Sequence, residues 1–367
     1  MKYNWELADW PEFSYSLKEL DQQLTEFILQ IGEVNGLVKT LSENIQQETR
    51  LELMLVEAIK TSEIEGEYFS REDIMSSLKN NLKLNKTPLA VRDKRANGIS
   101  SLMVNVHNTF KGKLTNEKLF EWHKLLFSTN NSINVGTWRK GSEPMQVVSG
   151  RTDKIEVHFE APPSKSVPSE MKKFIKWFNE TASGAINEIA NPIMRAGIAH
   201  LYFESIHPFE DGNGRIGRAI AEKALSQTLG IPVLISLSVA IEADKNAYYS
   251  ALKKAQKSNE ISNWLKYFAD ISLKAQKNTK DLVSFTLKKA KFFDEFKGKL
   301  NARQVKAVNK MFDAGLEGFE GGMTAQKYIS ITGASKATAT RDLKELETLN
   351  VLISYGGGRN THYNLNL

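Results

Sequence analysis

Apolar residues recur every three or four positions along most of this chain, the spacing typical of amphipathic α-helices. In the first part of the chain this spacing predicts helices over residues 17–31 and 51–61. Ser70, with Asp73 three positions later, has the signature of a helix N-cap and predicts a third helix after it. Residues 1–115 are therefore expected to form an N-terminal helical region.

One stretch interrupts the helical pattern of residues 116–275. Residues 145–159 consist of two short limbs on either side of residues 149–153, which have the composition of a turn. Along the second limb, apolar and polar side chains alternate. Such alternation around a turn predicts a β-hairpin. The Pro162-Pro163 pair that follows restricts the backbone, so we expect a rigid exit from the hairpin. An ordinary surface hairpin is the alternative to a functional one.

Residues 276–300 are rich in lysine and have helical spacing, so they are expected to form a connector. Beyond them the pattern predicts helices over 304–314, 324–331 and 336–349, then two short β-rich runs on either side of Gly356–Arg359. No Lys-Ser or Lys-Thr pair follows these glycines, so they indicate a hairpin tip and not a phosphate-binding loop. Three helices followed by a hairpin resemble a winged helix-turn-helix.

Bulk composition narrows the class of protein. The chain has 367 residues, of which 41% are hydrophobic and 25% charged, as in a globular protein of two or three domains. The formal net charge, 49 − 43 = +6, is too small to indicate nucleic-acid binding by itself. The absence of cysteine excludes disulfides, thiolate metal sites and a cysteine nucleophile. Without an apolar run of about 18 residues or a signal-peptide pattern, we expect a cytoplasmic protein with no membrane partner.

The candidate chemistry is concentrated in the run from His207 to Arg218, which reads His-Pro-Phe-Glu-Asp-Gly-Asn-Gly-Arg-Ile-Gly-Arg. An imidazole can act as a general base near neutral pH. Asp211 is a hard carboxylate of the kind that Mg²⁺ prefers. The Gly212-Asn213-Gly214 turn lets backbone N–H groups converge on an anion, and Arg215 and Arg218 carry forked donors that match phosphate oxygens. The run therefore predicts a nucleoside triphosphate site with a base beside it.

Two other interpretations apply to the same glycines. Residues 212–217 also match the dinucleotide fingerprint Gly-x-Gly-x-x-Gly, which has meaning only between a strand and a helix. The segment 193–205 has helical spacing, so no strand precedes these glycines. A plain glycine turn between two helices does not explain why a histidine, an aspartate and two arginines converge there.

The same run resembles the Fic family signature, His-Pro-Phe-x-(Asp/Glu)-Gly-Asn-Gly-Arg-x-x-Arg, at every fixed position. The resemblance implies an enzyme that transfers AMP from ATP to a hydroxyl side chain (Tyr, Thr or Ser) of a protein. It implies that His207 is the general base and that Asp211 holds Mg²⁺. It further implies that the Gly-Asn-Gly turn binds the α- and β-phosphates and that Arg215 and Arg218 steady the polyphosphate.

The resemblance also defines the expected fold. We expect a mainly α protein with a Fic-type helical core, in which the small β-hairpin is a flap that pairs with the backbone of the target protein. The expected domains are an N-terminal helical region with an inhibitory motif at 1–115, a catalytic core at 116–275, a helical connector at 276–300 and a winged helix-turn-helix domain at 301–367.

The segment from Thr61 to Gly66, Thr-Ser-Glu-Ile-Glu-Gly, resembles the inhibitory motif (Ser/Thr)-x-x-x-Glu-(Gly/Asn) of Fic proteins. The resemblance implies that Glu65 pairs with Arg218 and so prevents the γ-phosphate of ATP from binding there. A solvated acid at a helix end is the alternative. A buried Arg–Glu pair contributes little net stability because desolvation offsets attraction, but it can hold a site in an inactive state.

Three further residues resemble parts of the Fic pocket. Gly136-Thr-Trp-Arg139 resembles a Gly-x-x-Arg element, and Tyr248 and Tyr249 resemble part of a helix near the adenine. Both elements are alternatively parts of the core, because Tyr and Trp at helical spacing are usually buried. His200 lies seven positions before the signature histidine, as in a helical metal pair, but without a third zinc ligand it is expected to be a packed residue.

Protein adenylyltransferase is the first functional hypothesis, with ATP as co-substrate. Transfer of another nucleotide and removal of AMP are alternatives within the same site. A DNA-binding regulator with a nucleotide-sensing domain is an alternative of another class, because the last predicted helix carries Lys336, Arg341 and Lys344. The target is open at this point: another protein, or the chain itself, for which self-modification is expected.

Overall fold

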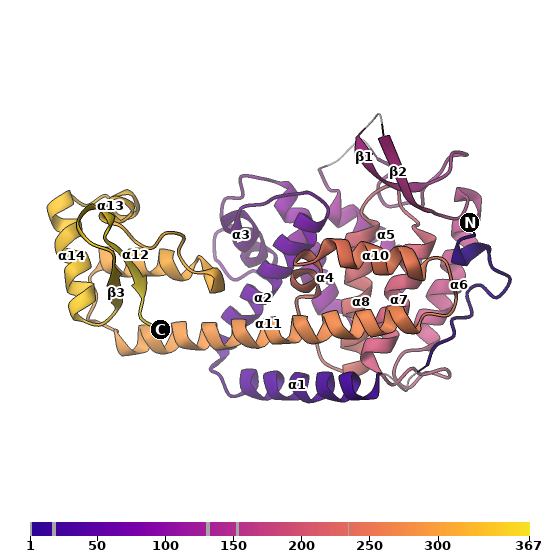
Figure 1. The fold of residues 1–367 in the computed structure, drawn as a ribbon, viewed down its shortest axis with the longest axis horizontal. Coiled ribbons are helices and arrows are strands. Elements are labelled where there is room, and N and C mark those ends of the chain that lie inside the picture. Colours follow the sequence, from indigo (N-terminus) through magenta and orange to yellow (C-terminus); the bar gives the residue numbers. More distant parts are fainter. Residues whose placement is uncertain (1, 17–19, 130–132, 152–153, 234) are drawn as a thin grey trace. The chain divides into compact units, whose positions relative to one another are not determined.

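The computed structural model describes residues 2–16, 20–129, 133–151, 154–233 and 235–367. Within these residues the fold is mainly helical, with two small antiparallel sheets of two strands each (Figure 1). The chain divides into two compact units, one formed by Met1–Leu37 and Arg50–Thr279 and the other by Val38–Thr49 and Lys280–Leu367. Each unit has its own apolar core. The expected mainly α fold with a small hairpin is confirmed.

Helices α7 (Pro192–Ile206) and α8 (Asn213–Leu229) pack against each other in the core of the first unit. Every residue of α7 is buried, which explains why its sequence is largely apolar all round. The signature run occupies the short connection between these two helices and the first residues of α8. Further helices that contribute to this unit are α4 (Arg95–Thr109), α5 (Asn116–Leu126), α6 (Val167–Glu180), α9 (Leu237–Glu242), α10 (Lys245–Ala255) and α11 (Ser262–Glu295), with short 3-10 helices at Asn4–Glu6 and Ser164–Ser166.

The N-terminal helices are α1 (Asp21–Lys39), α2 (Glu43–Ile64) and α3 (Arg71–Asn81). The helices predicted over 17–31 and 51–61 are present, although residues 17–19 lie outside the described part of the chain. α2 begins earlier than predicted because its first turns are mostly polar residues that favour a helix without adding an apolar face. Ser70 caps α3 as predicted, since its hydroxyl accepts a hydrogen bond from the backbone N–H of Asp73 (3.1 Å).

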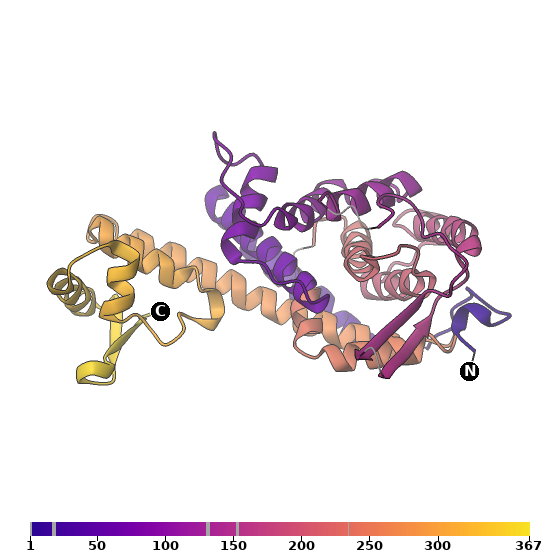
Figure 2. The same cartoon turned by 90° about the horizontal axis from the view of Figure 1, so that it is seen from above.

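The predicted hairpin consists of β1 (Gln146–Arg151) and β2 (Lys154–Glu160), which pair antiparallel and lie side by side in Figure 2. β1 continues through Arg151, so residues 149–151 of the predicted turn belong to the strand, and residues 152–153 lie outside the described residues. Phe159 at the base of β2 is buried against the ring of Tyr3, with centroids 5.0 Å apart. Val157, two positions earlier, is 40% exposed, so burial is confined to the base of the hairpin.

The second unit contains α12 (Ala302–Phe312), α13 (Ala325–Thr332), α14 (Lys336–Thr348), β3 (Leu352–Tyr355) and β4 (His362–Leu365), with 3-10 helices at Gly315–Glu317 and Gly358–Asn360. The order of three helices and a hairpin is the one that the sequence predicts. The side chains of Thr324 and Ser335 cap α13 and α14. The buried carboxylate of Asp342 accepts hydrogen bonds from Arg303 (2.8 Å) and Tyr328 (2.9 Å), which ties the first and second helices to the third.

None of the described helices is both long enough and apolar enough to cross a membrane.

Candidate functional site

The signature run forms the turn between α7 and α8. α7 ends at Ile206, and His207 has a left-handed backbone conformation (φ 48°, ψ 60°) as the C-cap. Gly212 is also left-handed (φ 79°) and directly precedes Asn213, the first residue of α8. This conformation is readily adopted by glycine but costs free energy in a histidine. The loop therefore depends on contacts that hold His207 in place.

Arg139 supplies several of these contacts. Its Nε donates to the carbonyl of His207 (2.8 Å), and its backbone N–H donates to the carbonyl of Pro208 (2.9 Å). Its guanidinium also donates to the carbonyl of Pro162, in the proline pair after the hairpin. Burial lowers the pKa of Arg139 to about 10, so the guanidinium remains charged at neutral pH. The sequence suggests Arg139 as a pocket wall, but the structure makes it a support of the loop that does not line the cavity.

Two further side chains stabilise the loop. The amide of Asn213 accepts a hydrogen bond from the backbone N–H of Phe209 and donates one to its carbonyl (both 2.9 Å). His123 Nδ1 accepts from the backbone N–H of Gly136 (2.8 Å), so Nε2 carries the proton and donates to the carbonyl of Asp211 (3.2 Å). The imidazole also stacks on Phe209, with centroids 4.2 Å apart. Burial lowers the pKa of His123, which keeps its ring neutral.

A cavity of about 740 Å³ opens at this loop. The residues that the sequence singles out and that line it are Glu65, His207, Asp211, Gly212, Asn213, Gly214, Arg218, Tyr248 and Tyr249. Hairpin residues such as Val147 and His158, and Lys253 of α10, complete the wall. Its volume is in the range of cavities that hold cofactors and small ligands.

An ion pair connects Arg218 to Glu65, with Nη2 and Oε1 2.7 Å apart. The same guanidinium donates from Nε to the hydroxyl of Thr61 (2.7 Å) and from Nη2 to its carbonyl (3.0 Å). Thr61 and Glu65 are four positions apart at the end of α2, so both reach the same partner. Burial acts to lower the pKa of Arg218, but the charge and hydrogen bond of Glu65 together with the nearby Tyr248 and Tyr249 outweigh it, so the pKa lies above its ordinary value.

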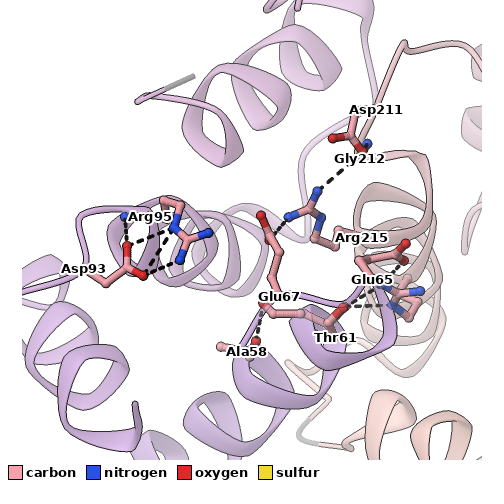
Figure 3. A network of polar contacts seen from close by, with 11 residues as sticks. Ala58, Thr61, Glu65, Glu67, Asp93, Arg95, Asp211, Gly212 and Arg215 are labelled. Atoms are coloured by element: carbon pink, nitrogen blue, oxygen red, sulfur yellow. Dashed lines mark hydrogen bonds and ion pairs between the residues drawn. The ribbon is translucent and has the colours of Figure 1, made fainter. Parts of the chain in front are cut away.

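A second acid of the same segment pairs with the other signature arginine. The carboxylate of Glu67 contacts the guanidinium of Arg215 (Figure 3). The same guanidinium lies 5.1 Å from the centroid of the Phe127 ring. Gly66 is left-handed (φ 79°) and lets the chain reverse after α2, so that Glu65 and Glu67 reach different arginines. Arg215 does not belong to the lining of the cavity, although the sequence suggests it as a phosphate clamp.

The two tyrosines of α10 differ in their surroundings. Tyr248 is buried, and its hydroxyl lies 2.8 Å from Nε2 of His200. His200 is thus a packed histidine, and the described residues contain no group of three or more His, Asp or Glu that could hold a metal. Tyr249 is 42% exposed, and partial burial raises its pKa to about 12, so its hydroxyl remains neutral.

Asp211 is the carboxylate that the sequence assigns to Mg²⁺. Its side chain is 56% exposed, lies 3.6 Å from Nη2 of Arg215 and accepts a hydrogen bond from the backbone N–H of Gly212. Mg²⁺ is commonly held by one or two carboxylates together with substrate phosphates and water. An accessible carboxylate beside the N-terminus of α8 fits this chemistry once a nucleotide is bound.

Comparison with known proteins agrees with the signature. Residues 113–225 match the Fic/DOC family, and residues 3–84 match a domain of unknown function, DUF4172. The chain contains a Fic/DOC domain.

Characterised relatives of the Fic domain carry the name protein adenylyltransferase. The chain is 28% identical over 128 residues to protein adenylyltransferase Fic of Nematostella vectensis, covering 35% of this chain and 28% of that protein. It is 28% identical over 153 residues to protein adenylyltransferase fic-1 of Caenorhabditis elegans, covering 42% of this chain and 26% of that protein. The chain is therefore a distant homologue of protein adenylyltransferase Fic, and it spans about a quarter of the length of these relatives.

Solved structures share the Fic fold over a longer stretch. A Fic family protein from Desulfovibrio desulfuricans G20 superposes with a TM-score of 0.54 at 18% identity, covering 97% of this chain and 98% of that one. A Fic domain containing signaling protein from Bacteroides thetaiotaomicron VPI-5482 has a TM-score of 0.53 at 19% identity, covering 73% of this chain and 97% of that one. The Fic-type helical fold expected from the sequence is thus confirmed.

Three residues around the Fic site escaped the sequence analysis. Glu67 follows Glu65 by two positions, and this repeated acid after a helix end is the signal that identifies it. Glu204 stands three positions before His207, and helical spacing places it on the same side. His123 has no comparable signal, because its partners belong to segments distant in sequence.

Proposed function

We propose that this protein transfers AMP from ATP to a hydroxyl side chain of a protein. The observation that carries the proposal is the single cavity in which His207, Asp211, the Gly212-Asn213-Gly214 turn and Arg218 meet. A base, an acid for a divalent cation, a helix N-terminus and a guanidinium are the groups that nucleotidyl transfer needs. The homology to protein adenylyltransferase Fic supports the same reaction.

In the proposed reaction a Tyr, Thr or Ser hydroxyl gives its proton to His207 as its oxygen attacks the α-phosphorus of ATP. The bond between the α-phosphorus and the bridging oxygen breaks, and pyrophosphate leaves. The backbone N–H groups at the start of α8 bind the phosphates, since the first turn of a helix has no internal acceptors for them. Mg²⁺ held by Asp211 neutralises phosphate charge when it is bound. Positioning and charge neutralisation supply most of the rate in such transfers.

The hairpin β1–β2 is the proposed docking site for the target. Gln146, Val147 and His158 of the hairpin line the same cavity as the catalytic loop. A strand of the target that pairs with the hairpin would bring its hydroxyl toward His207 by backbone hydrogen bonds alone. The chain itself is proposed as one target beside another protein.

Glu65 is the proposed inhibitor of this activity. Besides pairing with Arg218, its carboxylate lies so close to Gly214 that a β-carbon at that position would overlap Oε1. The carboxylate therefore sits at the N-terminus of α8, where an anion is favoured by the helix dipole. Glu65 competes with the nucleotide both for the guanidinium and for the anion position.

The radioactive position in ATP distinguishes AMP transfer from the alternatives. Using the Glu65→Gly variant, we expect label from α-³²P-ATP to become attached to protein and label from γ-³²P-ATP to be released as pyrophosphate. The reason is that attack on the α-phosphorus transfers AMP to the protein, while the β- and γ-phosphates leave together as pyrophosphate. Attachment of γ-label would instead indicate phosphate transfer and would contradict the proposal. Competition by unlabelled UTP or GTP reports on the nucleotide preference.

Glu67 is expected to restrain the site together with Glu65. Because Glu67 pairs with Arg215, the change Glu67→Gln in a Glu65→Gly background, where Arg218 is already released, should release Arg215 as well. Glu67 is partly exposed, so the pair is worth at most about 1 kcal/mol, and the gain in labelling rate should be about fivefold or less. Glu63→Gln is the matched control, since Glu63 pairs with Lys60 and not with a signature arginine. Equal rates with and without Glu67→Gln would remove it from the inhibitory segment.

Residues 301–367 of the second unit are, in our proposal, a winged helix-turn-helix domain. The exposed side of α14 carries Lys336 and Arg341, the cations expected to contact DNA. Two or three cations can contact only a few DNA phosphates. We therefore propose protein modification as the main function and DNA binding as the alternative.

A further inference from the structure

Glu204 lies on α7 one helical turn before His207 and faces the same cavity. Its Oε2 is 3.6 Å from Nδ1 of His207. Only 4% of Glu204 is exposed. A carboxylate that is removed from water in this way costs free energy unless a donor or a positive charge faces it.

Each of the two side chains has a buried polar atom that is left without a hydrogen bond among the described residues. Within the described residues, Nδ1 of His207 and Oε1 of Glu204 are both buried and have no hydrogen-bond partner. A small rotation about either side chain would bring Nδ1 and Oε2 within hydrogen-bonding distance. Hydrogen bonds of catalytic groups are often long before substrate binds and shorten in the reactive complex.

The space for this carboxylate is provided by α8. A β-carbon on Gly217 would overlap Oε1 of Glu204 and would lie 3.3 Å from Cε1 of His200. Glycine at this variable position of the signature therefore leaves room for the acid. Any larger residue would require the carboxylate of Glu204 to move.

The charge of Glu204 is maintained by its surroundings. Burial acts to raise the pKa of Glu204, but the contact with His207 and the nearby His200 and Arg218 outweigh it, so the pKa lies below its ordinary value. The hydroxyl of Tyr248 is occupied by His200. Glu204 is thus an anion at neutral pH that faces the imidazole of His207.

We propose that Glu204 is the positioning residue of the base His207, an inference that rests on the proposed AMP transfer. The carboxylate accepts the Nδ1–H of His207, which leaves Nε2 without a proton to serve as the base. When Nε2 takes the proton of the attacking hydroxyl, the imidazolium forms beside an anion and is stabilised. The proton stays on His207 and Glu204 stays ionised, as in other acid–histidine pairs.

The test compares full-length variants in the Glu65→Gly background. Glu204→Gln keeps the shape but removes the charge, and we expect kcat to fall about 100-fold or more, because loss of the orienting acid misplaces the histidine proton. We expect the Kd for ATP, measured by calorimetry, to stay within about twofold, since Glu204 is not expected to contact the phosphates. Combined with His207→Ala, Glu204→Gln should have no further effect on the rate, because the acid acts only through the histidine.

Glu57→Gln is the matched control. Glu57 is a buried acid of α2 that accepts hydrogen bonds from Ser236 and Ser238, and it should lose stability without losing kcat. A kcat for Glu204→Gln within about threefold of the parent would overturn the inference. Equal losses of kcat in Glu57→Gln and Glu204→Gln would also overturn it, because they would indicate a general effect on the fold.

The conservative variant covers the case in which Glu204→Gln does not fold. Glu204→Asp retains the charge but withdraws it from Nδ1, so an intermediate kcat with unchanged ATP affinity is expected, and a kcat equal to the parent's would overturn the inference. If the Glu65→Gly parent itself transfers no α-label, the proposed function fails. If the Glu65→Gly parent is active and Glu204→Gln has the same kcat, only the proposed role of Glu204 is refuted, and the proposed function stands.

Discussion

Replacing His207 by alanine is expected to lower the rate of AMP transfer about 10²–10⁴-fold, the usual contribution of a positioned general base. His207 lines the cavity beside Asp211 and the start of α8, and the structure offers the attacking hydroxyl no other imidazole in this loop. The measurement is attachment of label from α-³²P-ATP in the Glu65→Gly background, in which the site is open.

The fold should survive this change. The backbone of residue 207 is held through its carbonyl by Arg139 and through its N–H by Phe203 (2.9 Å), and both contacts persist with alanine. The left-handed conformation costs free energy in alanine as it does in histidine. We therefore expect a loss of only about 1 kcal/mol or less in the free energy of unfolding. His362→Ala, in the second unit, is the control and should label at the parent rate. Labelling by His207→Ala at the parent rate would show that His207 is not the base.

Replacing Glu65 by glycine is expected to raise the rate of AMP transfer about tenfold or more, which corresponds to removing about 1.4 kcal/mol of competition or more. The variant removes the carboxylate from the N-terminus of α8 and releases the Arg218 guanidinium for the γ-phosphate. The rate of label attachment and the Kd for ATP are the two measurements, and both should report stronger nucleotide binding.

The stability of this variant should change little. Desolvation offsets most of the attraction in a buried ion pair, and Arg218 retains its two hydrogen bonds to Thr61. We expect the Tm to stay within about 4 °C of the parent. Glu63→Gly is the control for adding a glycine near the end of α2, and it should leave the labelling rate unchanged. A labelling rate for Glu65→Gly equal to that of the wild-type chain would refute inhibition by Glu65.

Much of the local structure follows from contiguous sequence. The turn between α7 and α8 was predictable because its glycines, its histidine and its helix start lie within one short run. The same holds for the caps at Ser70 and Ser335, where the capping side chain and the N–H group that it accepts are three positions apart. In each case the interacting groups are neighbours along the chain, so their spacing defines their geometry.

Other features depend on groups that only folding brings together. Glu67 contacts Arg215 across 148 positions of sequence, and His123 reaches the carbonyl of Asp211 across 88. Arg139 carries a recognisable motif, yet its position as a support of the loop depends on how the segment after α5 packs against α7.

The order and spacing of residues 207–218 place a histidine, a carboxylate and two arginines beside one another, because all of them lie within twelve positions. Which of these groups face the cavity and which are occupied follows from the packing of segments that are far apart in the sequence. The donors of Arg215 and Arg218 are taken up by acids from the end of α2, and no spacing within the signature contains that information. The availability of a charged side chain depends on its neighbours in space, which the packing of the helices selects.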